Sequence, residues 1–145
     1  MRLRIVAVGA VKERSARALV DEYLGRIGRY CAVDEVEVRP GPPAREAAAI
    51  AKACEGSHLI ALDAGGKGFD SRGFASELER WASQGKGQIA FVIGGAAGLP
   101  EPTRRQAQAI WSLSPLTFPH RLARVLIAEQ IYRALTILRG EPYDK

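Results

Sequence analysis

Short apolar runs rich in β-branched residues alternate along the whole chain with segments of helical character. Strands are expected at 3–8, 33–39, 58–63, 88–93 and 110–114. Helices are expected at 14–29, at 43–55, from a cap at Asp70 or Ser71 onward, at 101–109 and at 120–139. This alternation predicts an α/β fold with a mostly parallel sheet covered by helices on both faces.

The length of 145 residues fits one domain. Gly41-Pro42-Pro43 is the nearest thing to a domain boundary, yet a fragment of about 40 residues before it is too small to fold alone. We therefore expect a single domain over residues 1–145.

The net charge of +5 is unevenly distributed, with seven basic and three acidic residues in the first 30 positions. Such an excess favours a polyanionic partner only weakly, because it is also typical of ordinary solubility. No apolar run approaches the roughly 18 residues needed to cross a bilayer. These features predict a cytoplasmic protein with no membrane segment.

The cysteines and histidines do not suggest a metal site. Cys31 and Cys54 lack CxxC spacing, and His58 and His120 are the only imidazoles. Reduced thiols and no bound metal are expected. Covalent catalysis has little support either, since no GxSxG motif is present.

Three successive strands are followed by loops rich in Gly or Pro, namely "DAGGKG", "GGAAGLP" and "PLTFPH". Ligands of open α/β sheets bind beyond the carboxyl ends of the strands, so these loops are the first candidates for a site. One such loop by itself is best explained as the end of a strand. Its recurrence on three strands indicates a binding site.

The glycines from Gly94 onward match neither common phosphate-binding motif. A dinucleotide fingerprint belongs to the first strand–helix turn and needs an acid about 20 residues later, where 113–119 has none. A P-loop ends in Gly-Lys-Ser/Thr, whereas Gly98 precedes Leu99 and Pro100. The loop is therefore expected to offer bare backbone to the flat face or polar edge of a ligand.

The last expected helix combines a wide apolar surface with embedded charges. Its apolar residues spread beyond one stripe, which we attribute to a subunit interface because the core of so small a protein is limited. Arg124 and Glu129 lie among these apolar residues and are hard to explain as solvated charges. His120 begins the helix, where a capping role and a functional role are equally compatible with the pattern.

Several segments, taken together, resemble one family. "LRIVAVGAVKE", "LDAGGKGFDSRGFA", "FVIGGAAGL", "LSPLTFPHRLARVLIAEQIYRAL" and "RGEPYDK" are similar to the RlmH (YbeA) family, the ribosomal RNA large subunit methyltransferase H group of the SPOUT superfamily. The resemblance covers essentially the whole chain, and the segment from Leu116 to Tyr143 is its most specific part. It implies a C-terminal trefoil knot, which general topology rules would not predict.

The resemblance also implies a function. Family members form homodimers, bind S-adenosylmethionine in the knot, and methylate N3 of a pseudouridine in helix 69 of 23S rRNA on assembled ribosomes. The positions that match the family's cofactor contacts are Leu62, Gly94, Leu113, Ser114, Pro115, Leu116, Thr117 and Phe118.

Methylation of N3 requires loss of an imide proton, which calls for a base or for a positive charge that stabilises the anion. His120 or Glu129 is the candidate base, and Arg124 or Arg133 the candidate charge stabiliser. Arg133 and Tyr143 are also candidates for contact with the substrate RNA.

Two departures from the family pattern bear on these expectations. The chain ends Tyr143-Asp144-Lys145 where the family usually has Tyr-His before a basic residue, and Ala97 replaces a commonly polar or acidic residue. A tail imidazole and a polar contact from position 97 are therefore not expected here. Two other functions stay open, a SPOUT methyltransferase acting on tRNA and a ribosome-binding module without catalysis.

Overall fold

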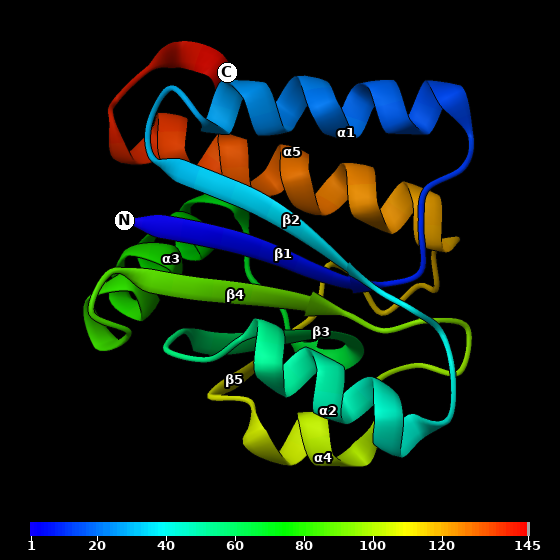
Figure 1. Cartoon of the computed structure of the whole chain (residues 1–145). Coiled ribbons are helices and arrows are strands. Elements are labelled where there is room, and N and C mark those ends of the chain that lie inside the picture. Colours follow the sequence, from blue (N-terminus) through cyan, green and yellow to red (C-terminus); the bar gives the residue numbers. More distant parts are fainter. Residues whose placement is uncertain (145) are drawn as a thin grey trace.

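Five parallel strands form a single sheet at the centre of the molecule. The computed structural model describes residues 1–144, with the side chain of Asp144 excepted. Figure 1 shows the strands, which lie in the order β2-β1-β4-β3-β5. They are β1 (Arg2–Val8), β2 (Ala32–Val38), β3 (His58–Lys67), β4 (Gln88–Ile93) and β5 (Ala109–Trp111). Every pairing between them is parallel, which confirms the predicted sheet.

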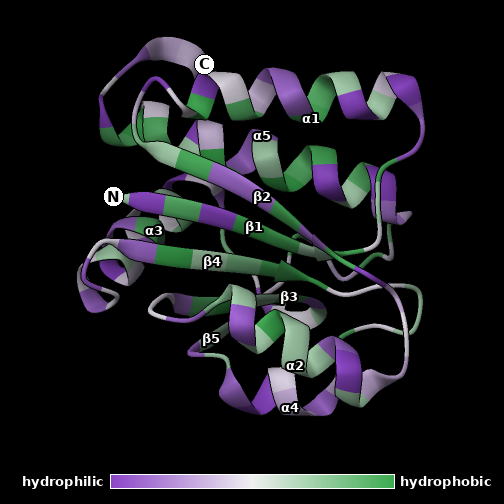
Figure 2. Ribbon diagram, in the orientation of Figure 1, coloured by the Kyte–Doolittle hydropathy of each residue, from purple (hydrophilic) through white to green (hydrophobic). Residues whose placement is uncertain are grey.

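Helices cover both faces of this sheet, as predicted. On one face lie α1 (Arg14–Ile27), α3 (Ser71–Gln84) and α5 (His120–Leu138), and on the other lie α2 (Pro43–Ala53) and α4 (Glu101–Gln106). A 3-10 turn, η1 (Pro142–Asp144), follows α5 and packs against it. Figure 2 shows that the strands in the middle of the sheet are predominantly hydrophobic, as burial on both faces requires.

The larger core lies between the sheet and the three helices on its first face. Aromatic side chains fill its centre: Phe74 of α3 stacks on Trp111 of β5 with ring centroids 4.1 Å apart, and Trp81 meets Phe91 edge-on. All four side chains are buried. Burial of aromatic rings contributes strongly to stability, and it also fixes α3 against β4 and β5.

Helix α5 lies between α1 and α3, and this arrangement corrects one argument made from the sequence. We attributed its wide apolar surface to a subunit interface because the core seemed too small to cover it. In the structure Ile127, Ile131 and Leu135 are buried in the core, and flanking helices cover the neighbouring residues. Packing within one chain accounts for most of this surface, and Leu122 remains 45% exposed.

The end of β3 differs from the expected glycine loop. Strand β3 runs on to Lys67, with an irregularity between Leu62 and Lys67 where both positions pair with Trp111. Gly66 allows this close approach, because a Cβ there would lie 2.6 Å from the carbonyl oxygen of Ile110. After Trp111 the chain leaves the sheet and reaches α5 through residues 112–119. The trefoil knot implied by the family resemblance stays a prediction.

Most of the remaining boundaries agree closely with the sequence, but β5 ends at Trp111, three residues before the predicted end at position 114. Asp70 caps α3 as expected, accepting a hydrogen bond of 2.7 Å from the backbone N–H of Gly73. Helix α4 is shorter than predicted, ending at Gln106, because Ala107 turns into extended backbone ahead of β5.

Candidate functional site

A cavity of about 820 Å³ lies beyond the carboxyl ends of the parallel strands. Its walls come from the segments that follow β1, β2 and β4, from residues 62–64 within β3, from the first turn of α2, from the segment that leads to α5, and from the first turns of α5. A volume of this size is typical of small-molecule and cofactor sites. The position agrees with the rule that open α/β sheets bind ligands at the carboxyl ends of their strands.

All but one of the positions expected to contact a cofactor line this cavity. They are Leu62, Gly94, Leu113, Ser114, Leu116, Thr117 and Phe118. Pro115 is not among the lining residues. The three loops singled out in the sequence therefore meet at one place, although only Asp63 and Ala64 of the "DAGGKG" segment reach the cavity.

The glycine loop after β4 folds tightly on itself. Gly95 and Gly98 form an isolated bridge, and the N–H of Gly98 donates to the carbonyl of Gly95 over 2.9 Å. A Cβ on Gly94 would lie 2.6 Å from the carbonyl carbon of Gly98, a distance that side chains do not tolerate. Gly98 itself adopts a φ of 82°, a conformation that favours glycine. The backbone of Gly94 is therefore approached closely by another part of the same loop, which leaves no room for a side chain.

Sequence reasoning missed one wall of the cavity. Gly9 and Ala10 follow β1, Pro40 and Gly41 follow β2, and Glu46 lies in the first turn of α2. We interpreted 41–43 only as a possible boundary. Application of the carboxyl-end rule to all five strands, rather than to the last three, would have found this wall.

The segment from Leu113 to Phe118 supplies apolar surface next to backbone polar groups. Ser114 turns the chain locally, since its Oγ accepts a hydrogen bond of 3.1 Å from the N–H of Leu116. Leu116 is 70% exposed although it lines the cavity. Such an exposed leucine beside a cavity is suited to cover the face of a flat ligand.

His120 lies at the junction of the cavity and α5. Its Nε2 is 3.1 Å from Nη1 of Arg124, and its ring also forms a hydrogen bond with the backbone of Gly94. Burial and then the adjacent Arg124 lower the pKa of His120, while the Gly94 contact and nearby carboxylates oppose this shift. The imidazole is therefore neutral at pH 7, and its Nε2 accepts from Arg124, because a guanidinium only donates.

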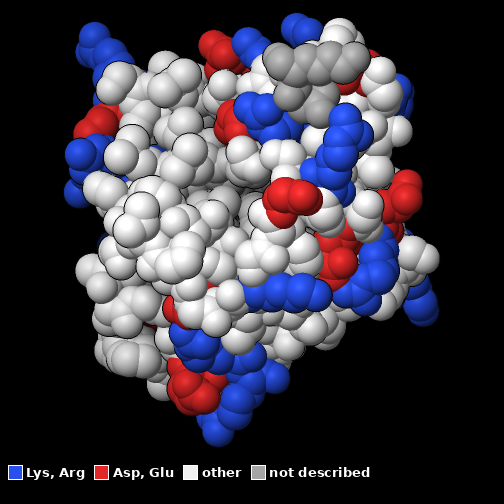
Figure 3. Space-filling model, turned by 180° about the vertical axis from the view of Figure 1, so that it is seen from behind, with Lys and Arg blue, Asp and Glu red and all other residues white. Residues whose placement is uncertain are grey.

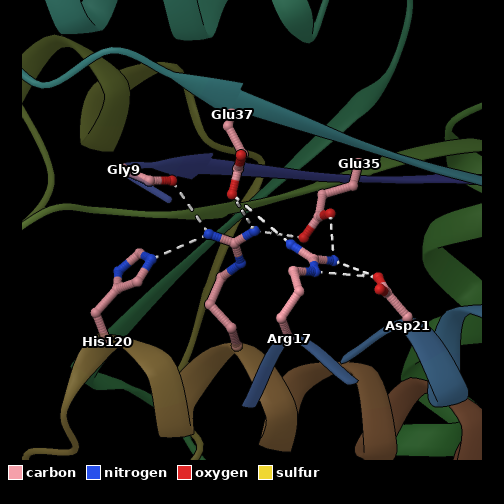
Figure 4. A network of polar contacts seen from close by, with 7 residues as sticks. Gly9, Arg17, Asp21, Glu35, Glu37 and His120 are labelled. Carbon is pink, nitrogen blue, oxygen red and sulfur yellow. Dashed lines mark hydrogen bonds and ion pairs between the residues drawn. The ribbon is translucent and has the colours of Figure 1, made fainter. Parts of the chain in front are cut away.

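Arg124 is buried in a network that joins α5 to β1, β2 and α1 (Figure 4). Its guanidinium forms ion pairs with Glu35 and, over 2.9 Å, with Glu37, and it donates to the carbonyl of Gly9 over 3.2 Å. Arg17 of α1 binds the same Glu35 over 2.7 Å. The side chain of Arg124 thus touches His120 and Gly9, two residues that line the cavity, without lining it itself.

The other predicted polar residues of α5 gather at its opposite end. Glu129 accepts hydrogen bonds from Arg133 over 2.7 Å and from the hydroxyl of Tyr143 over 2.8 Å. The guanidinium of Arg133 also lies 5.0 Å from the ring centroid of Tyr143. Burial, together with hydrogen bonds to Tyr23 and Glu129, raises the pKa of Tyr143. None of these residues lines the cavity of its own chain.

Both cysteines are free thiols in the structure. Burial raises the pKa of Cys54 to about 11, which leaves very little thiolate at pH 7. Within the described residues 1–144, no cluster of His, Cys, Asp or Glu is arranged to hold a metal ion. The described helices also include none with the length and apolar character needed to cross a membrane.

Comparison with known proteins places this geometry in context. The family described as "Predicted SPOUT methyltransferase" matches residues 1–144. A protein of Sorangium cellulosum named ribosomal RNA large subunit methyltransferase H is 57% identical over 143 residues, which cover 99% of each chain. A protein of the same name from Polynucleobacter asymbioticus is 44% identical, covering 100% of this chain and 99% of its own.

The fold is also found among solved structures. A probable methyltransferase from Bordetella pertussis superposes with a TM-score of 0.58 at 15% sequence identity, covering 92% of this chain and 96% of its own. At this identity the similarity concerns the fold alone.

Proposed function

The chain belongs to the SPOUT methyltransferase family, and from this premise we propose that it is an rRNA methyltransferase that modifies N3 of a pseudouridine in helix 69 of 23S rRNA. The methyl donor is S-adenosylmethionine. The convergence of three separate predicted segments on one cavity carries the proposal, because a spurious resemblance would not bring them together. The names of the relatives from Sorangium cellulosum and Polynucleobacter asymbioticus support the rRNA substrate.

The cavity fits such a donor in size and in chemistry. Leu62, Leu116 and Phe118 offer apolar surface for the faces of an adenine ring. Gly94 and its neighbours line the cavity with small or absent side chains, so their backbone groups can bind the polar edge of the ring. When bound, the donor supplies an activated methyl group on a sulfonium, so the protein mainly has to align the reactants.

The chain's own contribution to the chemistry is the removal of the imide proton. We assign His120 as the base, because it is neutral and lines the cavity. Since a guanidinium only donates, Nε2 of His120 accepts from Arg124, and this contact has to open before Nε2 accepts a proton. Arg124, which contacts the ring of His120 from behind the cavity wall, is the charge stabiliser that we propose.

Glu129 and Arg133 are the less favoured candidates for base and charge stabiliser. They pair with each other and do not line the cavity of their own chain. We propose instead that Arg133 and Tyr143 contact the substrate RNA, since a guanidinium beside an aromatic ring is suited to phosphates and bases. Lys145 and the side chain of Asp144, where the tail departs from the family pattern, lie outside the described residues.

We also propose that the protein acts as a homodimer in the cytoplasm, on the assembled large ribosomal subunit. Figure 3 shows a broad stretch of the rear face that carries neither basic nor acidic side chains, which is typical of a surface that pairs with another protein. Leu116 and Leu122 are among the large hydrophobic side chains that one chain leaves exposed. Analytical ultracentrifugation at micromolar concentration tests this, and a monomer would contradict it.

Mass spectrometry of rRNA and tRNA from a strain without this protein is the decisive test of substrate. We expect one methyl group to be missing from a pseudouridine of 23S rRNA, with the tRNA unchanged. A methyl group missing from tRNA would favour the alternative SPOUT activity.

Thermal unfolding with and without S-adenosylmethionine separates an enzyme from a ribosome-binding module without catalysis. A ligand that binds only the native state raises the unfolding temperature, by an amount that grows with the ligand concentration relative to Kd. Absence of any shift at saturating concentration would favour the binding module.

A further inference from the structure

The ionisable side chains around the cavity are biased toward negative charge. Among the described residues that line it, Glu46 and Asp63 are carboxylates, His120 is an imidazole, and there is no Lys or Arg. The protein as a whole carries a net charge of +5, so this bias runs against its overall composition. A ligand held here therefore meets a local field of the sign that attracts cations.

Glu46 is the less compensated of the two carboxylates. It lies in the first turn of α2, partly buried, and its Oε2 accepts a hydrogen bond of 2.9 Å from the N–H of Gly41. Within residues 1–144 no ion pair to Glu46 is found. A hydrogen bond to a backbone amide holds the carboxylate in place beside the cavity. The guanidinium of Arg45 lies against Gly41 and offsets part of the charge without forming an ion pair with Glu46.

Asp63 and His120 behave differently. The N–H of Gly65 and the guanidinium of Arg104 lower the pKa of Asp63, so this carboxylate is ionised at neutral pH. Arg104 pairs with it over 2.6 Å without lining the cavity, and thus offsets part of its charge. His120 is neutral there and adds no positive charge that would oppose the carboxylates.

Methyl transfer changes the charge of the cofactor by one unit. S-Adenosylmethionine carries a sulfonium, an ammonium and a carboxylate, whereas S-adenosylhomocysteine has a neutral thioether in place of the sulfonium. The methyl group forms a bond to N3 as its bond to sulfur breaks, the sulfur keeps the electron pair, and the imide proton passes to His120, the proposed base. His120 returns this proton to solvent before the spent cofactor leaves, so the site then holds no compensating positive charge. The positive charge therefore leaves the cofactor when the reaction is complete.

We propose that Glu46 makes the cavity discriminate by charge, holding the cationic donor more tightly than the product left after transfer. Asp63 adds to the same preference, reduced by Arg104. Loss of the positive charge then weakens the attraction and favours release of the spent cofactor. This inference rests on the proposed function, because it concerns the two forms of the proposed cofactor.

Calorimetric measurement of the Kd values for S-adenosylmethionine and S-adenosylhomocysteine tests the proposal. The variants are Glu46→Gln, whose amide oxygen can still accept the hydrogen bond from Gly41, and Glu55→Gln as a matched control, since Glu55 is exposed and does not line the cavity. A unit charge several ångströms away in a wet site changes affinity about two- to fivefold. We expect Glu46→Gln to lower the ratio of product Kd to donor Kd by up to this factor, since the guanidinium of Arg45 lies against Gly41 and offsets part of the charge, and Glu55→Gln to leave it unchanged.

A second measurement needs only the unmodified protein. Added salt screens charges, so donor affinity should fall more steeply with salt concentration than product affinity. An unchanged Kd ratio in Glu46→Gln, or equal salt dependence of the two ligands, would overturn the inference and leave the proposed function standing. Failure of the unmodified protein to bind either ligand would instead overturn the proposed function.

Discussion

The two ends of α5 carry similar residues in different settings. At the first end, His120 and Arg124 contact each other and the walls of the cavity. At the other end, Glu129 pairs with Arg133 and Tyr143, away from it. Glu129 lies nine positions after His120, a rise of roughly 13 Å along the axis. The sequence offered a candidate base and a candidate charge stabiliser at each end, but only those of the first end contact the cavity walls of their own chain.

The burial and the ion-pair partners of the arginine also differ between the two ends. Arg124 is fully buried, and its carboxylate partners come from β2, an edge strand distant in sequence. Arg133 keeps 28% of its side chain exposed and pairs with a residue one helical turn away. Loss of a buried charge leaves its partners uncompensated, whereas water can replace a half-exposed partner. The position of the side chains at the cavity end of α5 (His120 and Arg124) therefore depends on contacts with distant segments. The position of those at the tail end (Glu129, Arg133 and Tyr143) depends largely on residues close by in the sequence.

The largest expected effect distinguishes the two arginines. Arg124→Met should lower the free energy of unfolding by about 3 kcal/mol, because Glu35 and Glu37 both lose their buried partner and keep only the partly exposed Arg17. Arg133→Met should lower it by about 1 kcal/mol or less. Urea unfolding measures both, and equal losses would break the comparison.

If the Arg124→Met variant folds, its cofactor binding and its methyl transfer are measured in separate experiments. A loss of transfer with retained binding supports the assignment of Arg124 as charge stabiliser. Unchanged transfer removes Arg124 from the reaction. The double variant Arg124→Met with Glu35→Gln should recover part of the lost stability, since it removes one of the two carboxylates that then share only Arg17.

A smaller effect is expected from Gly94→Ala at the cavity. The added methyl group would meet the backbone of Gly98 at 2.6 Å, so the loop has to shift, at an expected loss of about 1–3 kcal/mol. Donor affinity should fall along with stability. Gly25→Ala in α1 is the matched control, because a Cβ there meets nothing within 4 Å and alanine favours a helix. An unaltered Kd in Gly94→Ala would contradict the role of this loop as a cavity wall.

The substitution Tyr143→Phe changes only the cluster of Glu129, Arg133 and Tyr143, away from the cavity. Loss of the hydroxyl removes its hydrogen bond to Glu129, which should lower the free energy of unfolding by about 1 kcal/mol. Because no residue of this cluster lines the cavity, calorimetry should give an unchanged Kd for S-adenosylmethionine. A changed Kd would show that the two ends of α5 are coupled.

The smallest effect concerns pH. The pKa of His120 is lowered in the folded protein, so below about pH 6.5 the unfolded chain binds a proton that the folded chain does not. Stability should therefore fall as pH decreases through this range, and His120→Gln should fall less. The pKa of His58 is also lowered, so His58→Gln serves as the comparison variant. Equal pH dependence in the unmodified protein and in His120→Gln would contradict the shift.

Local patterns were sufficient for most of the architecture. Apolar runs placed the five strands, and the cap at Asp70 marked the start of α3. They failed where contacts between distant segments decide the outcome. Strand β3 runs past its glycines to Lys67 because β5 pairs with it there, and the wide apolar surface of α5 is covered by α1 and α3. Neither pairing has a signal in the local sequence.

The sequence by itself determined the fold class, the family and the three segments that meet at the cavity. Each of these depends on periodicity or on a run of contiguous residues, and both are properties of neighbours along the chain. Only the tertiary structure decided that Glu46 lies in the cavity wall and that Arg124 is bound by Glu35 and Glu37. Those contacts join residues far apart in the chain, because the carboxyl ends of parallel strands come together at one edge of the sheet.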